Sequence, residues 1–116
     1  MSYRFGHIEL FARDPEASRC FYVDALGARL VADQGRTQWV EIGGAVILLR
    51  PGAPEVPADY RRAAEGLVLY CADAAQLEAR LQQAGVETGR ADQDDCVTFQ
   101  DLDGHWWQAV TMPESE

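Results

Sequence analysis

The sequence predicts an α+β fold in which a βαβββ unit is used twice. Two helix starts of the same kind, Asp14-Pro-Glu-Ala17 and Asp73-Ala-Ala-Gln76, carry this prediction, because an aspartate stands at each where an N-cap is expected. A strand-like segment directly precedes each helix start, at 6–13 and 65–72. Each helix is closed by a glycine and followed by a short strand and a hairpin. The repeat lies in the order of elements, and two units are expected to pair because one cannot bury both faces of its sheet.

The first unit, expected at about residues 3–50, begins with an alternating segment, Gly6–Ala12. Alternation places Ile8 and Leu10 on one face of a strand, and His7, Glu9 and Phe11 on the other. After Asp14, a proline at the first helical position favours a helix that ends near Gly27. Four side chains of this helix are expected to face the core: Ala17, Cys20, Phe21 and Val23. A short strand is expected at Ala28–Ala32, with a turn at Gly35-Arg36.

A hairpin is expected to close the first unit. Its strands are Gln38–Ile42 and Ala45–Arg50, and Gly43-Gly44 supplies a two-residue turn. If Ile42 pairs with Ala45, two further cross-strand pairs follow on one shared face, Trp39 with Leu48 and Glu41 with Val46.

A proline-rich connector, 51–64, leads to the second unit at about 65–112. A strand at Leu67–Cys71 is followed by an amphipathic helix that begins after Asp73 and ends at Gly85. Its buried face is expected to carry Leu77, Leu81 and Ala84. A short strand, Val86–Thr88, and a solvated turn at 92–95 come next, and residues 113–116 are expected to fray.

The last hairpin joins Cys96–Gln100 to Trp106–Thr111 through the turn-forming sequence Asp101-Leu-Asp-Gly104. Alternation puts Trp106, Gln108 and Val110 on one face, and Trp107, Ala109 and Thr111 on the other. Trp107 and Phe99 are expected in the core beneath the second helix.

Composition and charge exclude several classes of protein. With 116 residues, of which 47% are hydrophobic and 25% charged, the chain is typical of one compact globular domain. No apolar run approaches the roughly 20 residues of a membrane span, and residues 1–7 lack the apolar core of a signal peptide. We therefore expect a cytoplasmic protein with no membrane partner. The net charge of −9, with arginine as the only basic residue type, argues against nucleic acid as a partner. It is compatible with solubility alone or with attraction of cationic small molecules.

Three widely spaced cysteines, Cys20, Cys71 and Cys96, do not make a disulfide framework. They are expected to be small buried hydrophobic residues in a reducing compartment. A reactive thiol is the alternative.

Three motifs accompany this order of elements: His7-Ile-Glu-Leu-Phe-Ala-Arg-Asp14, Phe21-Tyr22 ahead of Leu26-Gly27, and Asp101-Leu-Asp-Gly-His105. Together with the order of elements, they resemble the vicinal oxygen chelate superfamily, which includes glyoxalases, bleomycin-resistance proteins and extradiol dioxygenases. The resemblance covers nearly the whole chain and is specific for the fold, not for the reaction. It implies two βαβββ modules that form a curved half-barrel sheet with helices on the convex face. It also implies a homodimer, often with sites shared between chains.

Metalloenzymes of this superfamily hold a divalent cation with His, Glu or Gln side chains on the concave face of the sheet. The resemblance places the four ligand positions at His7, Leu48, Gly66 and Gln108. Leucine and glycine offer no ligand atom, and glutamine is neutral where the family has an acid, whereas hard cations need several converging ligand atoms. Glu9 and Glu41 could substitute only in an unusual geometry. We therefore expect no metal, no other cofactor and no catalytic residue.

The resemblance and the strand alternation together predict an aromatic-lined concave face that binds a small organic molecule, cationic or aromatic. The aromatic rings would stack on this ligand, the two glutamates would attract positive charge, and the histidine and glutamine would hydrogen-bond. Arginine would pair with a glutamate or receive a ligand carboxylate. The expected ligand-binding residues are His7, Glu9, Phe11, Trp39, Glu41, Leu48, Arg50, Tyr70, Trp106 and Gln108. For the aromatic residues, packing in the core or in a dimer interface is the alternative.

The functional expectation is a bleomycin-resistance-like protein that sequesters its ligand without chemistry. The alternative is a divalent-metal-dependent lyase, isomerase or dioxygenase of the same superfamily that uses His7, with a partner chain completing the metal shell. A third possibility, a regulatory or accessory domain, predicts no small-molecule pocket.

Overall fold

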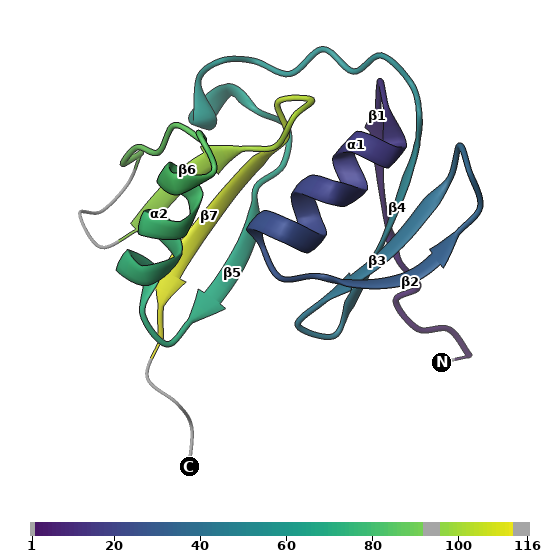
Figure 1. Ribbon diagram of the computed structural model, residues 1–116, viewed down its shortest axis with the longest axis horizontal. Coiled ribbons are helices and arrows are strands. Elements are labelled where there is room, and N and C mark those ends of the chain that lie inside the picture. Colours follow the sequence, from purple (N-terminus) through teal and green to yellow (C-terminus); the bar gives the residue numbers. More distant parts are fainter. Residues whose placement is uncertain (1, 92–95, 113–116) are drawn as a thin grey trace. The chain divides into compact units, whose positions relative to one another are not determined.

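The computed structural model describes residues 2–91 and 96–112, and the chain forms two compact units, Met1–Pro54 and Glu55–Glu116. Both units are mixed sheets with a helix on one face (Figure 1). The predicted α+β class is therefore confirmed. The expected turn at 92–95 and the tail at 113–116 lie outside the described residues.

The first unit contains four strands in the order β1-β4-β3-β2, with β1 parallel to β4 and the other pairs antiparallel. Helix α1 packs against β3 and β4. The elements are β1 (Ile8–Ala12), α1 (Pro15–Cys20), a π-helical continuation (Phe21–Ala25), β2 (Arg29–Asp33), β3 (Gln38–Ile42) and β4 (Ala45–Pro51).

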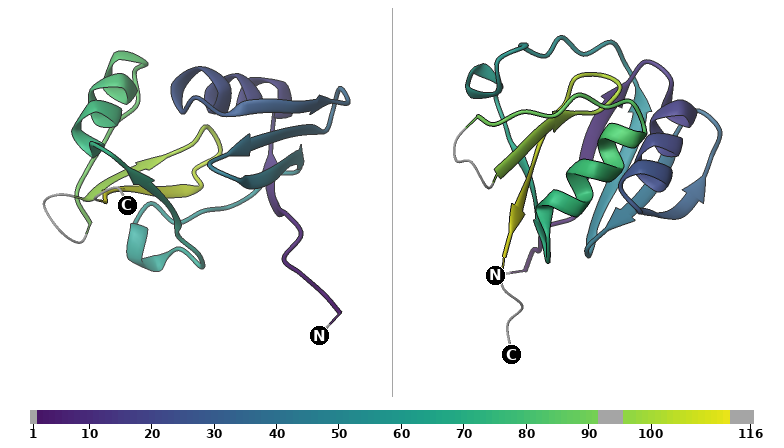
Figure 2. Two further views of the ribbon diagram at one scale, coloured as in Figure 1. Left: turned by 90° about the horizontal axis from the view of Figure 1, so that it is seen from below. Right: turned by 60° about the vertical axis from the view of Figure 1, so that its left-hand side comes forward.

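The second unit repeats this order with one strand fewer. Its sheet has the order β5-β7-β6, with β5 parallel to β7 and β6 antiparallel to it. Helix α2 packs against β6 and β7 (Figure 2). The elements are a 3-10 turn (Tyr60–Arg62), β5 (Leu67–Cys71), α2 (Ala74–Gln83), β6 (Cys96–Gln100) and β7 (Trp106–Thr111).

The predicted ends of the first helix are confirmed, but its buried face is not the predicted one. Asp14 caps the start by accepting a bond from the Ala17 amide at 3.2 Å, and Gly27 ends it with a φ of 73°. The side chains buried along the helix are Pro15, Ser18, Tyr22 and Ala25, whereas Cys20 is exposed and Ala17, Phe21 and Val23 are only partly buried. Hydrophobicity alone does not identify this buried face, because Ser18 is polar and Tyr22 is amphipathic. The wider π turn also changes which side chains share a face after Cys20.

The predicted hairpin of the first unit is confirmed in its register. Trp39 pairs with Leu48, Glu41 with Val46, and Ile42 with Ala45. Both turn glycines have positive φ, 56° at Gly43 and 91° at Gly44. This is the type I′ geometry that suits a two-residue hairpin turn, because its twist matches that of the strands.

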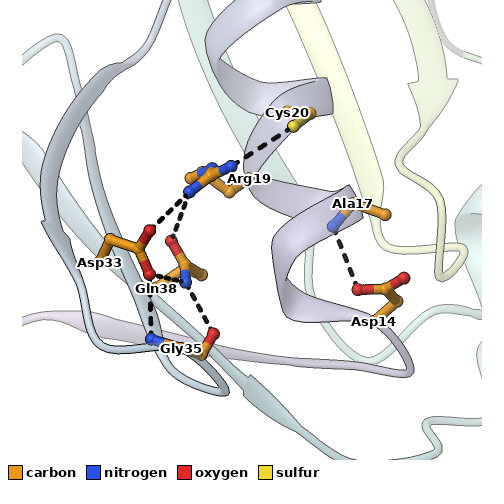
Figure 3. A network of polar contacts seen from close by, with 7 residues as sticks. All are labelled: Asp14, Ala17, Arg19, Cys20, Asp33, Gly35 and Gln38. Atoms are coloured by element: carbon orange, nitrogen blue, oxygen red, sulfur yellow. Dashed lines mark hydrogen bonds and ion pairs between the residues drawn. The ribbon is translucent and has the colours of Figure 1, made fainter.

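A buried glutamine ties α1 to β2 and β3 in the first unit (Figure 3). The Gln38 side chain donates to Asp33 Oδ1 at 2.6 Å and to the Gly35 carbonyl at 2.7 Å, and it accepts from Arg19 at 3.3 Å. Arg19 also donates to Asp33 Oδ2 at 3.1 Å. The bond from Gln38 and the Gly35 amide hold the pKa of the Asp33 carboxyl below its usual value. Since Gln38 is fully buried, these bonds replace the water that its amide would lose.

The core of the second unit lies between α2 and its sheet. Ala74, Val97 and Ala109 form a buried cluster, against which Cys71 and Leu77 pack. Phe99 and Trp107 are buried as predicted, with their rings stacked at a centroid distance of 6.5 Å. Leu81 is also buried as predicted, but Ala84 is exposed because it is the C-cap beyond the last helical turn.

The prediction of a strand at Val86–Thr88 is wrong. A single bridge joins Gly89 to Thr98, and the segment before it leaves the sheet. Helix α2 holds this segment instead: Thr88 Oγ1 donates to Glu78 at 2.7 Å, and Arg90 makes two further bonds to Glu78, each at 2.8 Å. Side-chain bonds to the helix therefore replace the expected strand pairing.

Two further expectations concern cysteines and membrane spans. All three cysteines have free thiols, and Cys96 is buried and Cys71 partly buried, but Cys20 is exposed, contrary to prediction. Within residues 2–91 and 96–112, no helix is long and apolar enough to cross a membrane.

Candidate functional site

Seven of the ten predicted ligand-binding residues lie in the first unit, on the sheet face formed by alternate residues of β1, β3 and β4. Strand register places Glu9 beside Leu48, which in turn lies beside Trp39. One position further along, Phe11 lies beside Arg50. We call this face the module-one face; its predicted members are His7, Glu9, Phe11, Trp39, Glu41, Leu48 and Arg50.

Glu9 is the centre of the polar contacts on the module-one face. One carboxylate oxygen accepts from Arg50 at 2.9 Å, and the other accepts from His7 Nε2 at 3.1 Å. These bonds, the one from His7 foremost, hold the pKa of the Glu9 carboxyl below its usual value. Both oxygens of Glu9 are therefore already bonded within this unit.

Two aromatic contacts complete this cluster. The His7 ring meets Trp39 edge-on, with a centroid distance of 4.8 Å. The Arg50 guanidinium carbon lies 5.6 Å from the centroid of Phe11, within cation–π range. Phe11 is 44% exposed, so its ring is accessible from solvent. A basic head group, an imidazole and two aromatic rings thus share one surface.

The second glutamate of the module-one face is also paired. Glu41 lies opposite Arg29 on β2, whose guanidinium is 3.3 Å from its carboxylate. The face therefore carries two glutamates, each bonded to an arginine, and it is not an acidic surface. Exposed pairs of this kind contribute little stability, but they determine the charge that a ligand meets.

The other three predicted residues lie in the second unit, on the face formed by Tyr70 of β5 and by Trp106 and Gln108 of β7. Gln108 is only 6% exposed. Its Oε1 accepts a bond from the Tyr60 hydroxyl at 2.8 Å. Tyr60 also meets the Trp106 ring edge-on at 5.6 Å, and the Trp106 indole donates to the Pro57 carbonyl at 2.8 Å. Tyr70 is 75% exposed.

Gly66 makes room for Tyr60. A Cβ at position 66 would lie 3.0 Å from the Tyr60 hydroxyl oxygen, which is closer than nearly all real contacts of that kind. A side chain at position 66 would therefore require the Tyr60 hydroxyl to shift by a few tenths of an ångström.

The residues at the expected metal positions do not fit a divalent cation. Leu48 and Gly66 offer no ligand atom, and the oxygen of Gln108 is bonded to Tyr60. Both oxygens of Glu9 are bonded as well. In the part of the chain that the structure describes, no three His, Cys, Asp or Glu side chains gather in a group that could hold a metal ion.

One residue beside each of the two faces escaped prediction, Arg29 in the first unit and Tyr60 in the second. Tyr60 stands in a proline-rich segment that was expected to be only a connector, and its contact with Gln108 spans 48 residues. Arg29 lies on β2, where it pairs with Glu41 just before a register shift between Leu30 and Ala32. Asp59, which caps the 3-10 turn that contains Tyr60, is a local sequence signal for that turn.

Several solved structures are similar to this chain. TnmS3, an antibiotic binding protein from Streptomyces sp. CB03234, is 26% identical over 97% of this chain and 99% of its own, with a TM-score of 0.75. The genomically encoded fosfomycin resistance protein FosX from Listeria monocytogenes is 18% identical over 97% and 96%, with a TM-score of 0.76. TioX from Micromonospora sp. ML1 is 20% identical over 97% and 99%, with a TM-score of 0.70.

Sequence comparison gives the family. Comparison with curated protein sequences found no match. The family model described as the glyoxalase/bleomycin resistance protein/dioxygenase superfamily matches residues 4–109. This match spans both units and includes all ten predicted ligand-binding residues. The chain therefore belongs to the glyoxalase/bleomycin resistance protein/dioxygenase superfamily.

Proposed function

We propose that this protein binds a small aromatic organic molecule and sequesters it without chemical change. The observation that carries the proposal is the cluster on the module-one face, where the Trp39 and Phe11 rings flank His7 and the Arg50–Glu9 pair. Flat rings supply stacking area at a small entropic cost, while a few fixed polar groups orient the ligand. The antibiotic-binding activity named for TnmS3 supports the same class of function.

The charge of this face refines the expected ligand. Glu9 and Glu41 were expected to attract positive charge, but each is bonded to an arginine. An arginine has five N–H donors, so Arg50 keeps donors for a ligand after bonding Glu9. The module-one face therefore suits an aromatic ligand that carries an oxygen acceptor, such as a phenol, a quinone or a carboxylate.

A screen of aromatic compounds by thermal shift and tryptophan fluorescence tests the proposal. A ligand should raise the melting temperature and be recovered unchanged by mass spectrometry. Trp39→Ala and Arg50→Ala should each weaken its binding at least tenfold. Arg36→Ala, which removes an exposed arginine from the turn before β3, serves as the matched control and should leave affinity unchanged. Failure of every compound to shift the melting temperature would favour an accessory domain.

The competing function is metal-dependent catalysis through His7. Metal analysis of the purified protein, followed by titration with Zn²⁺, Ni²⁺, Mn²⁺ and Fe²⁺, separates the two. We expect no tight stoichiometric binding, because the residues at the ligand positions lack donor atoms. Tight binding that is lost in His7→Ala would overturn the sequestration proposal. We further propose that the protein is cytoplasmic and forms a homodimer; sedimentation of the purified protein would test the dimer.

A further inference from the structure

A hollow of about 310 Å³ lies in the second unit, beside residues Val86–Thr88, which were predicted to form a strand and do not. This volume is at the lower end of the range for small-molecule sites. Its lining residues come from the segment before β6, from β6 itself and from the start of β7: Val86, Glu87, Thr88, Gly89, Thr98, Phe99, Gln100 and Trp106.

The hollow is held open by helix α2. The Gly89–Thr98 bridge has two backbone bonds of 2.9 Å, and residues 86–88, which precede it, do not pair with β6. Thr88 is held by Glu78 and accepts a second bond from Gln82 at 3.1 Å. These bonds keep residues 86–88 on the helix side, so a strand cannot close the gap.

The polar side chains that line the hollow are Glu87, Thr88, Thr98 and Gln100, of which Glu87 and Gln100 bring carboxylate and amide oxygens that accept hydrogen bonds. Gln100 donates from its Nε2 to the Gly104 carbonyl at 3.0 Å, and its Oε1 can accept a bond from a ligand. The Trp106 N–H donates to the Pro57 carbonyl, so Trp106 presents only its π system to a ligand. Gln100 pairs with Trp106 between β6 and β7, and Glu87 lines the same hollow.

The Glu87 carboxylate brings an uncompensated charge to this hollow. The nearest arginine in sequence, Arg90, makes two bonds to Glu78. Glu87 is exposed and has no hydrogen-bond or ion-pair partner among the described residues. A carboxylate, an amide oxygen and an indole ring together favour a cation with N–H donors, because an ammonium ion can satisfy the oxygens and interact with the ring.

We propose that this hollow binds an organic ammonium ion, with Glu87 as the counter-ion, Gln100 Oε1 as an acceptor and Trp106 as the aromatic wall. The proposal rests on the proposed function, because Trp106 is also one of the expected ligand-binding residues. It adds a ligand class to the second unit that differs from the oxygen acceptors suited to the module-one face.

The test uses three probes of similar size: 2-phenylethylammonium, 2-phenylethanol and 3-phenylpropionate. Titration is followed by tryptophan fluorescence and by the ¹⁵N–¹H signals of the Trp106 indole and the Gln100 side-chain amide. We expect the ammonium probe to bind at least tenfold more tightly than the other two and to shift both signals. Glu87→Gln should weaken its binding at least fivefold, whereas Glu65→Gln, at an exposed acid just before β5, should not.

Three results would overturn the proposal: equal affinity for the alcohol, binding unchanged in Glu87→Gln, or no binding of the ammonium probe. Trp106→Phe keeps an aromatic wall and should retain most of the affinity, whereas Trp106→Ala should lose it. A failure of this proposal is distinguishable from a failure of the proposed function. The proposed function is tested on the first unit, by Trp39→Ala and Arg50→Ala with a different ligand. A folding defect is excluded by an unchanged ¹⁵N–¹H spectrum away from the hollow.

Discussion

The hydroxyl of Tyr60 donates a hydrogen bond to Oε1 of Gln108 at 2.8 Å, from a place that a side chain at position 66 would obstruct. The bond covers a face of β7 with a residue from the segment between the two repeats. It also satisfies an amide oxygen that is otherwise almost removed from water. The contribution of this bond can be tested by measuring the free energy of unfolding of variants at positions 60 and 66.

Tyr60→Phe should lower the free energy of unfolding by about 1 kcal/mol, because it removes one hydrogen bond and leaves the Gln108 oxygen unsatisfied. Gly66→Ala should have an effect of similar size, because its Cβ would push the Tyr60 hydroxyl away from Gln108. Urea unfolding followed by circular dichroism measures both.

The double variant distinguishes this coupling from two separate effects. In the Tyr60→Phe background, the hydroxyl that meets the new Cβ is gone, so Gly66→Ala should cost less than it does alone. If Gly66→Ala lowers the free energy of unfolding by the same amount in both backgrounds, position 66 and the Tyr60 hydroxyl are not coupled.

Gln38→Ala should be more destabilising, by about 2–3 kcal/mol, because it leaves a cavity and strips a buried network of its central amide. Three groups lose a partner: Asp33, the Gly35 carbonyl and Arg19. Thermal and urea unfolding measure the effect. Gln83→Ala, at an exposed position of α2, is the control and should stay within about 0.5 kcal/mol of the natural chain. A small effect of Gln38→Ala would mean that water replaces the side chain.

Gly44→Ala should cost about 1 kcal/mol through the backbone alone. Its φ of 91° is one that residues with a Cβ rarely adopt, yet no atom lies within 4 Å of where the Cβ would be. Gly6→Ala is the matched control, since Gly6 has the same open surroundings and no positive φ. If both variants unfold at the same urea concentration, the turn is not strained by a side chain.

The sequence predicted those parts of the fold whose signals are local. The Asp14 and Asp73 caps, the glycine stops and the hairpin through Gly43-Gly44 are all encoded within a few neighbouring residues, and the structure confirms them. Strand alternation together with the family resemblance predicted that Glu9 and Arg50 share a face, and the pairing of β1 with β4 places them there.

The parts that escaped prediction depend on contacts between distant residues. Val86–Thr88 has the composition of a strand, but Glu78 of α2, about ten residues earlier, competes for Thr88 and Arg90. Tyr60 stands in a segment that has the composition of a linker, but the folded chain places its hydroxyl next to Gly66. In both places a side chain far away in sequence decides the local structure, which composition and spacing do not reveal.

The contact of Glu78 with Arg90 and Thr88 should make the second unit sensitive to acid. Bonds from Arg90 and Thr88 lower the pKa of the Glu78 carboxyl from 4.5 to about 2. In the unfolded chain the carboxyl takes up a proton below its ordinary pKa, whereas in the folded chain it stays ionised down to about pH 2. Its stabilising effect is therefore complete above pH 4.5 and is lost progressively as the pH falls from 4.5 towards 2.

Glu78→Gln should remove this pH dependence. At neutral pH the variant should be less stable by about 1–2 kcal/mol, a figure reduced from the full pKa shift because Arg90 is partly exposed and water screens the pair. The difference from the natural chain should shrink as the pH is lowered through this interval. Urea unfolding at a series of pH values measures it, with Glu65→Gln as the control. A constant difference from pH 7 to pH 2 would show that Glu78 acts by packing and not by its charge. Because the same contact holds residues 86–88 away from β6, Glu78→Gln should also weaken binding of 2-phenylethylammonium in the hollow.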